Sequence, residues 1–101
     1  MKITDIRIRK LFEIDRLRAI VSITIDDLLV VHDIKVVQGE ERLFVAMPSR
    51  RDETGMFRDV VHPINSEGRE FIEKLILEAY EEEKAKEEKI NILASEENEY
   101  F

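Results

Sequence analysis

The chain has 101 residues, of which 44% are hydrophobic and 39% are charged, and its formal net charge is −7. This length suits one domain with a modest core, and no apolar run approaches the roughly 20 residues that a membrane-spanning helix needs. The absence of cysteine excludes disulfides and thiolate metal sites, and the charged start MKITDIRIRK does not resemble a signal peptide. We therefore expect a soluble, cytoplasmic protein without a membrane partner.

The acidic charge is concentrated at the end of the chain. Residues 80–101 hold eight glutamates and three lysines, a net −5, which leaves 13 basic and 15 acidic groups, a net −2, in residues 1–79. Exposed charges more than about 10 Å apart are largely screened at 0.1 M salt. A local arginine cluster can therefore attract an anion, unless neighbouring carboxylates such as Asp52, Glu53 and Asp59 neutralise it.

Alternation of apolar and charged residues predicts a strand at the start of the chain. Ile6 and Ile8 alternate with charged residues, whereas Ile3 is out of phase with them. One extra residue in a strand produces such a change of phase. The sequence therefore predicts a β-bulge near Thr4 or Asp5.

Four further strands are predicted from the same period of two. The segment 16–26 alternates between an apolar and a mostly polar face, and 29–37 is apolar on both faces, which is typical of a central strand. A polar turn at 38–42 then separates it from two apolar runs, 43–47 and 56–61. Together with the first strand they predict a five-stranded antiparallel sheet in meander order.

The apolar period changes to that of a helix after Asn65 and Ser66, either of which can cap its start. The fold class is therefore α+β: the five-stranded meander followed by one C-terminal amphipathic helix, in a domain spanning 1–80. The acidic extension 81–101 either continues the helix into solvent or forms a mobile tail. The stripe expected to face the sheet comprises Phe71, Ile72, Leu75, Ile76, Ala79 and Tyr80.

The predicted sheet implies a partner, because one helix covers only part of one face and leaves the strand edges bare. A homodimer that shares strands or sheets across a two-fold axis is the simplest solution. It would also duplicate any binding site that the chain carries.

Residue types that could support catalysis have simpler interpretations. His32 and Asp33 are neighbours on a strand and should point to opposite faces, so we place His32 in the core with a hydrogen bond. No serine is tied by its sequence context to a histidine base and a carboxylate. We expect no enzyme activity, cofactor, metal or small-molecule substrate; a hydrolase using His62 is the weakest alternative. Phe44 and Phe57 could stack on bases, but core packing is the simpler expectation.

Arginines gather around the loop between the last two strands. Arg50 and Arg51 lie in that loop, Arg58 lies on the strand that leaves it, and Arg69 lies in the first helical turn. Planar guanidinium groups suit phosphates and base edges, and loops on a rigid scaffold often present binding residues. Gly68 would allow close approach to the helix start, whose N–H groups attract phosphate. A frayed helix start with ordinary solvated arginines explains the same pattern equally well.

Four sequence blocks resemble a known family. RAIVSITIDD, VVHDIKVV, LFVAMPSRR and FRDVVHPINSEGR, in this order and spacing, are similar to the stage V sporulation protein G family (SpoVG), septation regulators of bacteria. The resemblance covers about residues 1–80. It implies a small dimeric domain of antiparallel sheet plus C-terminal helix, which regulates cell division, septation and gene expression by binding DNA and, in some members, RNA.

The resemblance also maps the binding site. The family's basic loop corresponds to Arg50 and Arg51, with Arg58 on the following strand, and its variable helix start corresponds to 66–71. That segment reads SEGREF here, so two glutamates flank its arginine and weaken its attraction for phosphate. The predicted nucleic-acid-binding residues are Arg50, Arg51, Arg58, Ser66, Gly68 and Arg69.

Two hypotheses follow from the sequence. The first is a homodimeric, nucleoid-associated regulator that binds DNA or RNA through these residues and has no enzymatic activity. The second is a protein-interaction adaptor of the division machinery, whose arginine loop grips an acidic partner and whose nucleic-acid binding is incidental. The acidic extension and the weakly negative body fit the second hypothesis better.

Overall fold

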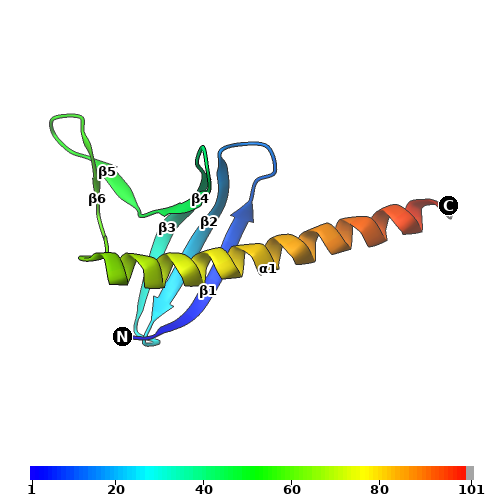
Figure 1. The fold of residues 1–101 in the computed structure, drawn as a ribbon, viewed down its shortest axis with the longest axis horizontal. Helices are drawn as coiled ribbons and strands as arrows, with labels where there is room; N and C mark the ends of the chain where they lie inside the picture. The colour runs from blue at the N-terminus through cyan, green and yellow to red at the C-terminus, as the bar shows by residue number, and fades with distance from the viewer. Residues whose placement is uncertain (100–101) are drawn as a thin grey trace.

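The computed structural model describes residues 1–99, with side chains described for residues 1–90, as six strands and one long helix (Figure 1). In chain order they are β1 (Ile3–Leu11), β2 (Leu17–Ile25), β3 (Leu29–Gln38), β4 (Leu43–Ala46), β5 (Ser49–Arg51), β6 (Phe57–Asp59) and α1 (Ser66–Glu99). The α+β class predicted from the sequence is confirmed.

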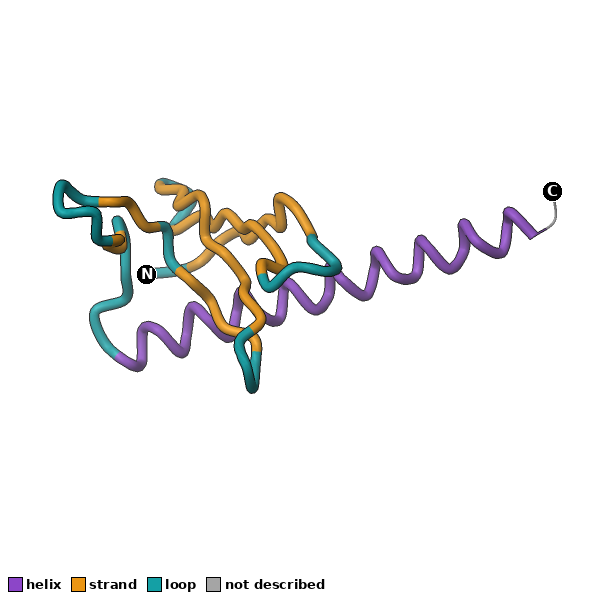
Figure 2. The backbone as a smooth tube through the Cα atoms, turned by 90° about the horizontal axis from the view of Figure 1, so that it is seen from above, coloured by secondary structure: helices purple, strands orange, loops and turns teal. Residues whose placement is uncertain are grey.

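The main sheet contains four strands in the order β1-β2-β3-β4, each antiparallel to its neighbour (Figures 1 and 2). The meander order and the interior position of β3 are as predicted. The prediction of a fifth strand in this sheet is wrong, because β6 pairs with β5 in a separate two-stranded sheet. Pro48 lies two residues after Ala46, the last residue of β4, and has no N–H to donate to a ladder. The pairing with β3 therefore does not continue past this residue.

The predicted bulge in β1 is confirmed. The register of β1 against β2 shifts between Ile3 and Asp5, which leaves Thr4 without a partner residue. This extra residue restores the phase, so that Ile3, Ile6 and Ile8 all pack against the same core.

A bulge in β3 overturns the prediction that His32 is a core residue. Val31 and Ile34 are both buried although three positions separate them, since one extra residue lies between them in the register against β2. Asp33 adopts a left-handed conformation with φ of 62°, which aspartate tolerates better than most residues. The side chain of His32 is therefore exposed. The hydrogen bond that was expected for it is present, because its Nδ1 lies 2.9 Å from the hydroxyl oxygen of Ser22.

The core lies between one face of the main sheet and α1, which crosses that face (Figures 1 and 2). Ile76 and Tyr80 are the buried helix residues, and Ile72 packs beside them. Full burial of each such side chain contributes about 1.5–3 kcal/mol. Of the predicted stripe, Ile72, Ile76 and Tyr80 are confirmed as core residues, Leu75 and Ala79 are partly buried, and Phe71 is wrong because it is 47% exposed. Leu77, which was not predicted, also packs against the core. The buried core residues are Ala19, Val21, Ile23, Val31, Ile34, Val36, Val45, Met47, Ile76 and Tyr80.

Helix α1 begins at a capped turn and continues well past the sheet. Asn65 is the cap, because its Oδ1 accepts the N–H of Gly68 at 2.7 Å. At about 1.5 Å per residue, the helix sets the 56 Å length of the molecule, and its C-terminal part extends beyond the strands (Figure 1). Of the segment predicted as a mobile tail, 90–99 is helical, and Tyr100 and Phe101 lie outside the described residues.

Candidate nucleic-acid interface

Strands β5 and β6 form a short hairpin that projects away from the main sheet (Figures 1 and 2). Arg50 and Arg51 were predicted in a loop, but they lie on β5; Arg58 lies on β6, as expected. Arg50 is directly opposite Arg58, and Arg51 is directly opposite Phe57. Opposite residues of an antiparallel pair share a face. One face of the hairpin therefore carries two arginines, and the other carries an arginine and an aromatic ring.

Asp52 fixes the turn of this hairpin. Its Oδ1 accepts the backbone N–H of Thr54 at 2.9 Å, the hydroxyl of Thr54 at 2.6 Å and the N–H of Met56 at 3.0 Å. Hydrogen bonds from Thr54 and Arg58 lower the pKa of Asp52 from 3.8 to about 2. Gly55 completes the turn with φ of +87°, a conformation that glycine adopts without strain. The two strands are thus held at a defined spacing.

Arg58 is held by the same carboxylate. Its Nε lies 2.6 Å from Oδ2 of Asp52, in an ion pair whose arginine side chain is largely exposed. Arg50 and Arg51 differ, since neither forms an ion pair with any residue whose side chain the structure describes. The sequence raised the alternative that neighbouring carboxylates neutralise the arginines. This alternative holds for Arg58. It does not hold for Arg50 and Arg51, which form no ion pair with a described side chain.

Phe57 corrects a further prediction. It was expected in the core, but it is 68% exposed, because β6 pairs with β5 in a separate sheet and, among the described residues, no second layer covers this sheet. The guanidinium carbon of Arg51 lies 5.4 Å from the centre of its ring, within the range of a cation–π interaction. Phe44, on β4, is partly buried.

The helix start lies at the same end of the molecule as the hairpin (Figure 1), but its residues line a separate groove. Ser66 and Arg69 share this groove with Arg42, Glu70 and Glu73, and Arg42 Nη1 lies 2.6 Å from Glu73 Oε1. The N–H of Gly68 already donates to the cap residue. Of the six predicted residues, the structure therefore groups the three hairpin arginines and places Ser66, Gly68 and Arg69 apart from them.

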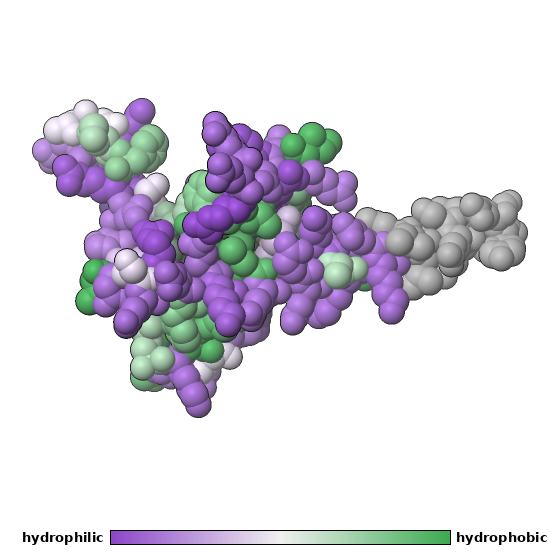
Figure 3. Space-filling view, in the orientation of Figure 1, coloured by the Kyte–Doolittle hydropathy of each residue, from purple (hydrophilic) through white to green (hydrophobic). Residues whose placement is uncertain are grey.

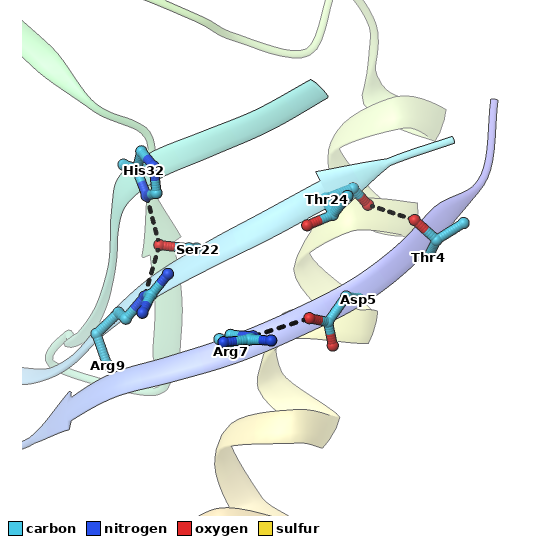
Figure 4. Close-up of polar contacts among 7 residues, drawn as sticks. All are labelled: Thr4, Asp5, Arg7, Arg9, Ser22, Thr24 and His32. Atoms are coloured by element: carbon cyan, nitrogen blue, oxygen red, sulfur yellow. Dashed lines mark hydrogen bonds and ion pairs between the residues drawn. The ribbon is translucent and has the colours of Figure 1, made fainter. Parts of the chain in front are cut away.

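The face of the sheet turned away from α1 carries polar groups that the sequence reasoning missed (Figure 4). Arg9 Nε donates to Ser22 Oγ at 3.3 Å, and this hydroxyl lies 2.9 Å from His32 Nδ1. Ser22 is only 5% exposed, so the two larger side chains cover it across three strands. Arg7 stands on the same face, 3.0 Å from Asp5. The alternation of Arg7 and Arg9 with Ile6 and Ile8 was the sequence signal for these cations.

Other functional classes gain no support from the geometry. Within residues 1–90, whose side chains the structure describes, no group of three histidine, aspartate or glutamate side chains could hold a metal ion. Within residues 1–99, no helix is long and apolar enough to cross a membrane. His62 Nδ1 lies 2.9 Å from the backbone carbonyl oxygen of Pro63. This ring nitrogen therefore bonds the backbone rather than a carboxylate that could orient a catalytic base.

Fold and site together define a small α+β domain with a four-stranded meander, one helix across one face and a projecting hairpin of exposed arginines. The family model SpoVG matches residues 1–82. The chain belongs to the SpoVG family, which confirms the resemblance seen in the four sequence blocks.

Curated relatives agree with this assignment. The chain is 57% identical to a protein of Lachnospira eligens over 81 residues, which cover 80% of this chain and 92% of the relative. It is 55% identical to a protein of Desulforudis audaxviator over 87 residues, 86% of this chain and 99% of the relative. A protein of Caldanaerobacter subterraneus subsp. tengcongensis is 55% identical over 91 residues, 90% of this chain and 98% of the relative. Each of the three is named "Putative septation protein SpoVG".

Proposed function

We propose that this protein is a non-enzymatic regulator of septation and gene expression, which binds DNA or RNA as a homodimer through the β5–β6 hairpin. The observation that carries the proposal is the pair Arg50 and Arg51, exposed on a projecting element and without ion-pair partners among the described side chains. The septation role is supported by the name that the relatives carry.

Phosphate contacts are the chemistry for which the hairpin is best suited. Arginine presents planar donors that match phosphate oxygens, and backbone contacts of this kind supply most sequence-independent affinity. Arg58 adds a third guanidinium group whose position is fixed by Asp52. Ser66 and Arg69, in the groove at the helix start, stand where a bound strand leaving the hairpin could make further contacts, although two nearby glutamates weaken that groove for phosphate.

The negative balance of the whole chain is compatible with this site because of where the charge lies. The glutamate-rich part of α1 extends from the body at the end opposite the hairpin (Figure 1). Charges separated by more than a screening length of about 10 Å interact weakly at 0.1 M salt. In this arrangement the acidic helix does not cover the arginines, and its repulsion for a polyanion favours approach from the hairpin end.

The salt dependence of binding tests the proposal. For duplex DNA, each neutralised phosphate contributes about −0.9 to the slope of log affinity against log salt concentration. The double variant Arg50→Ala/Arg51→Ala should bind more weakly, with a slope shallower by about 1–2. The control variant Lys84→Ala/Lys86→Ala removes the same charge from exposed positions on the helix extension and should keep the wild-type slope. Equal slopes in both variants would defeat the assignment of the hairpin arginines.

The adaptor hypothesis, in which the arginine hairpin grips an acidic partner protein, remains the second candidate, because the net charge of −7 and the acidic extension of α1 oppose the binding of a polyanion such as nucleic acid. The two hypotheses differ at physiological ionic strength. The regulator should retain labelled DNA or RNA in a gel-shift titration, whereas the adaptor should retain neither. Retention that is lost in the Arg50→Ala/Arg51→Ala variant supports the first hypothesis directly.

A further inference from the structure

Helix α1 is much longer than the sheet that it crosses is wide. Four strands about 4.8 Å apart span roughly 14 Å between the outer strand axes, whereas the 34 residues of α1 span roughly 51 Å. Tyr80 is the last buried residue of the helix among those described. Residues 81–90 follow it and are exposed except for the half-buried Glu83, and Figure 3 shows mostly hydrophilic atoms over this segment. Packing against its own sheet therefore does not explain why α1 continues past Tyr80.

A groove lies where α1 passes beyond the strands, between the helix and the end of β1 (Figure 1). Its volume is about 320 Å³, at the small end of the range of about 300–1,000 Å³ for ligand sites. A space of this size suits one or two side chains of a partner better than a large ligand. The ring of Phe12, at one side, has the ammonium nitrogen of Lys10 5.1 Å from its centre. The apolar residues that line the groove are Leu11, Phe12 and Tyr80, and the charged ones are Glu13, Arg18, Lys84, Glu87 and Glu88.

Tyr80 brings a free hydrogen-bonding group to this groove. The residue is only 3% exposed, and its hydroxyl forms no hydrogen bond with any residue whose side chain the structure describes. Among these residues no fully buried polar side-chain atom lacks a partner, so the hydroxyl reaches the surface, and it does so at the groove. Tyrosine hydroxyls in buried surroundings usually have a partner. The hydroxyl is therefore available to a ligand that enters the groove.

The charged residues of the groove are mostly acidic. Glu87 and Glu88 on α1 and Glu13 on the β1–β2 turn form no ion pair with a described side chain. Of the two cations, Arg18 is turned toward its own chain, because its Nη1 donates to the backbone carbonyl oxygen of Glu13 at 2.6 Å. The other cation is Lys84. Three carboxylates against two cations favour a basic ligand and disfavour a phosphate.

We propose that this groove docks a short segment of another protein, in which an apolar side chain is followed by lysine or arginine residues. The apolar side chain packs against Leu11, Phe12 and the ring of Tyr80, and the Tyr80 hydroxyl donates to a backbone carbonyl oxygen of the segment. The basic side chains meet Glu87 and Glu88. An apolar centre with a charged rim is the usual arrangement of a protein interface, and opposite charges fix its register.

This docking surface is separate from the proposed nucleic-acid interface. The groove lies at the end of the sheet where α1 leaves it, whereas the β5–β6 hairpin projects from the other side (Figure 1). Both surfaces can therefore be occupied at the same time. The inference goes beyond the proposed function and does not depend on it.

An NMR titration of the isotopically labelled full chain tests the inference. The probe is the acetylated and amidated peptide Gly-Ser-Phe-Lys-Arg-Lys-Ser-Gly, without nucleic acid. We expect saturable amide shifts in residues 11–13 and 84–88, with a dissociation constant at or below about 1 mM. A control peptide with serine in place of phenylalanine should bind about fivefold more weakly or worse. A second control, with glutamate in place of the basic residues, should give no saturable shift.

Variants of the protein separate the parts of the site. Tyr80→Phe retains the buried ring and should weaken binding about two- to tenfold, through loss of one hydrogen bond. Glu87→Gln/Glu88→Gln should weaken it about three- to tenfold. The matched control Glu81→Gln/Glu82→Gln removes the same charge from residues that do not line the groove and should bind within about twofold of the wild type. Circular dichroism checks folding, and the glutamine variants, at exposed positions, carry the test if Tyr80→Phe does not fold.

Several results would overturn the inference. They are the absence of a saturable shift with the phenylalanine peptide, equal weakening in the two glutamine variants, and shifts that are largest in residues 49–59. If dilution of the protein alone or addition of a single-stranded oligonucleotide moves the groove resonances, a second copy or nucleic acid is the occupant and the inference fails. The proposed function fails separately, because Arg50→Ala/Arg51→Ala should lose nucleic-acid affinity and keep its affinity for the peptide.

Discussion

The side chains that β2 and β3 turn toward α1 are buried, whereas every residue of β5 and β6 is exposed. The body is held by apolar burial across two layers. The hairpin is held by a turn carboxylate and a few backbone hydrogen bonds. The comparison indicates that the stability of this domain resides in the body, while the groups suited to binding stand on the hairpin, where residues can change without cost to the core.

Truncation in the core should have the largest effect on stability. Ile76 is fully buried between α1 and the sheet, so Ile76→Ala should lower the free energy of unfolding by about 2–5 kcal/mol through lost burial and the cavity left behind. Denaturant unfolding monitored by circular dichroism measures this loss. A cost below about 1 kcal/mol would show that the helix face is not the centre of the core.

The start of α1 should show an intermediate effect. Asn65→Ala removes the Oδ1 acceptor of the Gly68 N–H, and loss of an N-cap costs about 0.5–2 kcal/mol. Asn65→Asp retains the acceptor and serves as the matched control. Equal thermal midpoints for the two variants would contradict the capping role.

The hairpin turn should respond locally rather than globally. Gly55→Ala places a side chain at φ of +87°, which costs roughly 1–2 kcal/mol for a residue other than glycine. Amide hydrogen exchange in residues 49–59 should accelerate about five- to thirty-fold, while exchange in β2 stays unchanged. A similar acceleration in both regions would mean that the hairpin and the body open together.

Acid should loosen the hairpin before the body, with a small effect. The pKa of Asp52 is depressed in the folded chain, from 3.8 to about 2. Its stabilising contribution is therefore complete above about pH 4 and is lost as the pH falls through 2. The protection factor of the Met56 amide should fall across this window in the wild type. In the Asp52→Asn variant this protection factor should not depend on pH. An unchanged Met56 amide in acid would contradict the role of this carboxylate.

Much of the body could be predicted from local sequence. The alternation of β2, the bulge near Thr4 and the helix stripe around Ile76 each follow from residues close together in the chain. The bulge at Asp33 could not be predicted in this way, because the run 29–37 is apolar on both faces and gives no sign of a change of phase. The bulge reverses which face each residue occupies.

The hairpin was harder to predict, because pairing is a long-range choice. The runs 43–47 and 56–61 both have strand character, yet only the first joins the main sheet, and Pro48 is the sole local sign of the break. Exposure of Phe57 and pairing of Arg58 with Asp52 depend on that choice. The grouping of Arg50, Arg51 and Arg58 was predicted from the sequence, whereas the separation of Arg69 from this group required the fold.

Chemical-shift mapping of the labelled protein with a short DNA or RNA duplex or single strand tests the central claim most directly. The account predicts that the largest amide shifts fall in residues 49–59, with weaker shifts at the start of α1 and none in residues 81–90. Shifts confined to the sheet face that carries Arg9 and His32, or to the acidic part of α1, would contradict it.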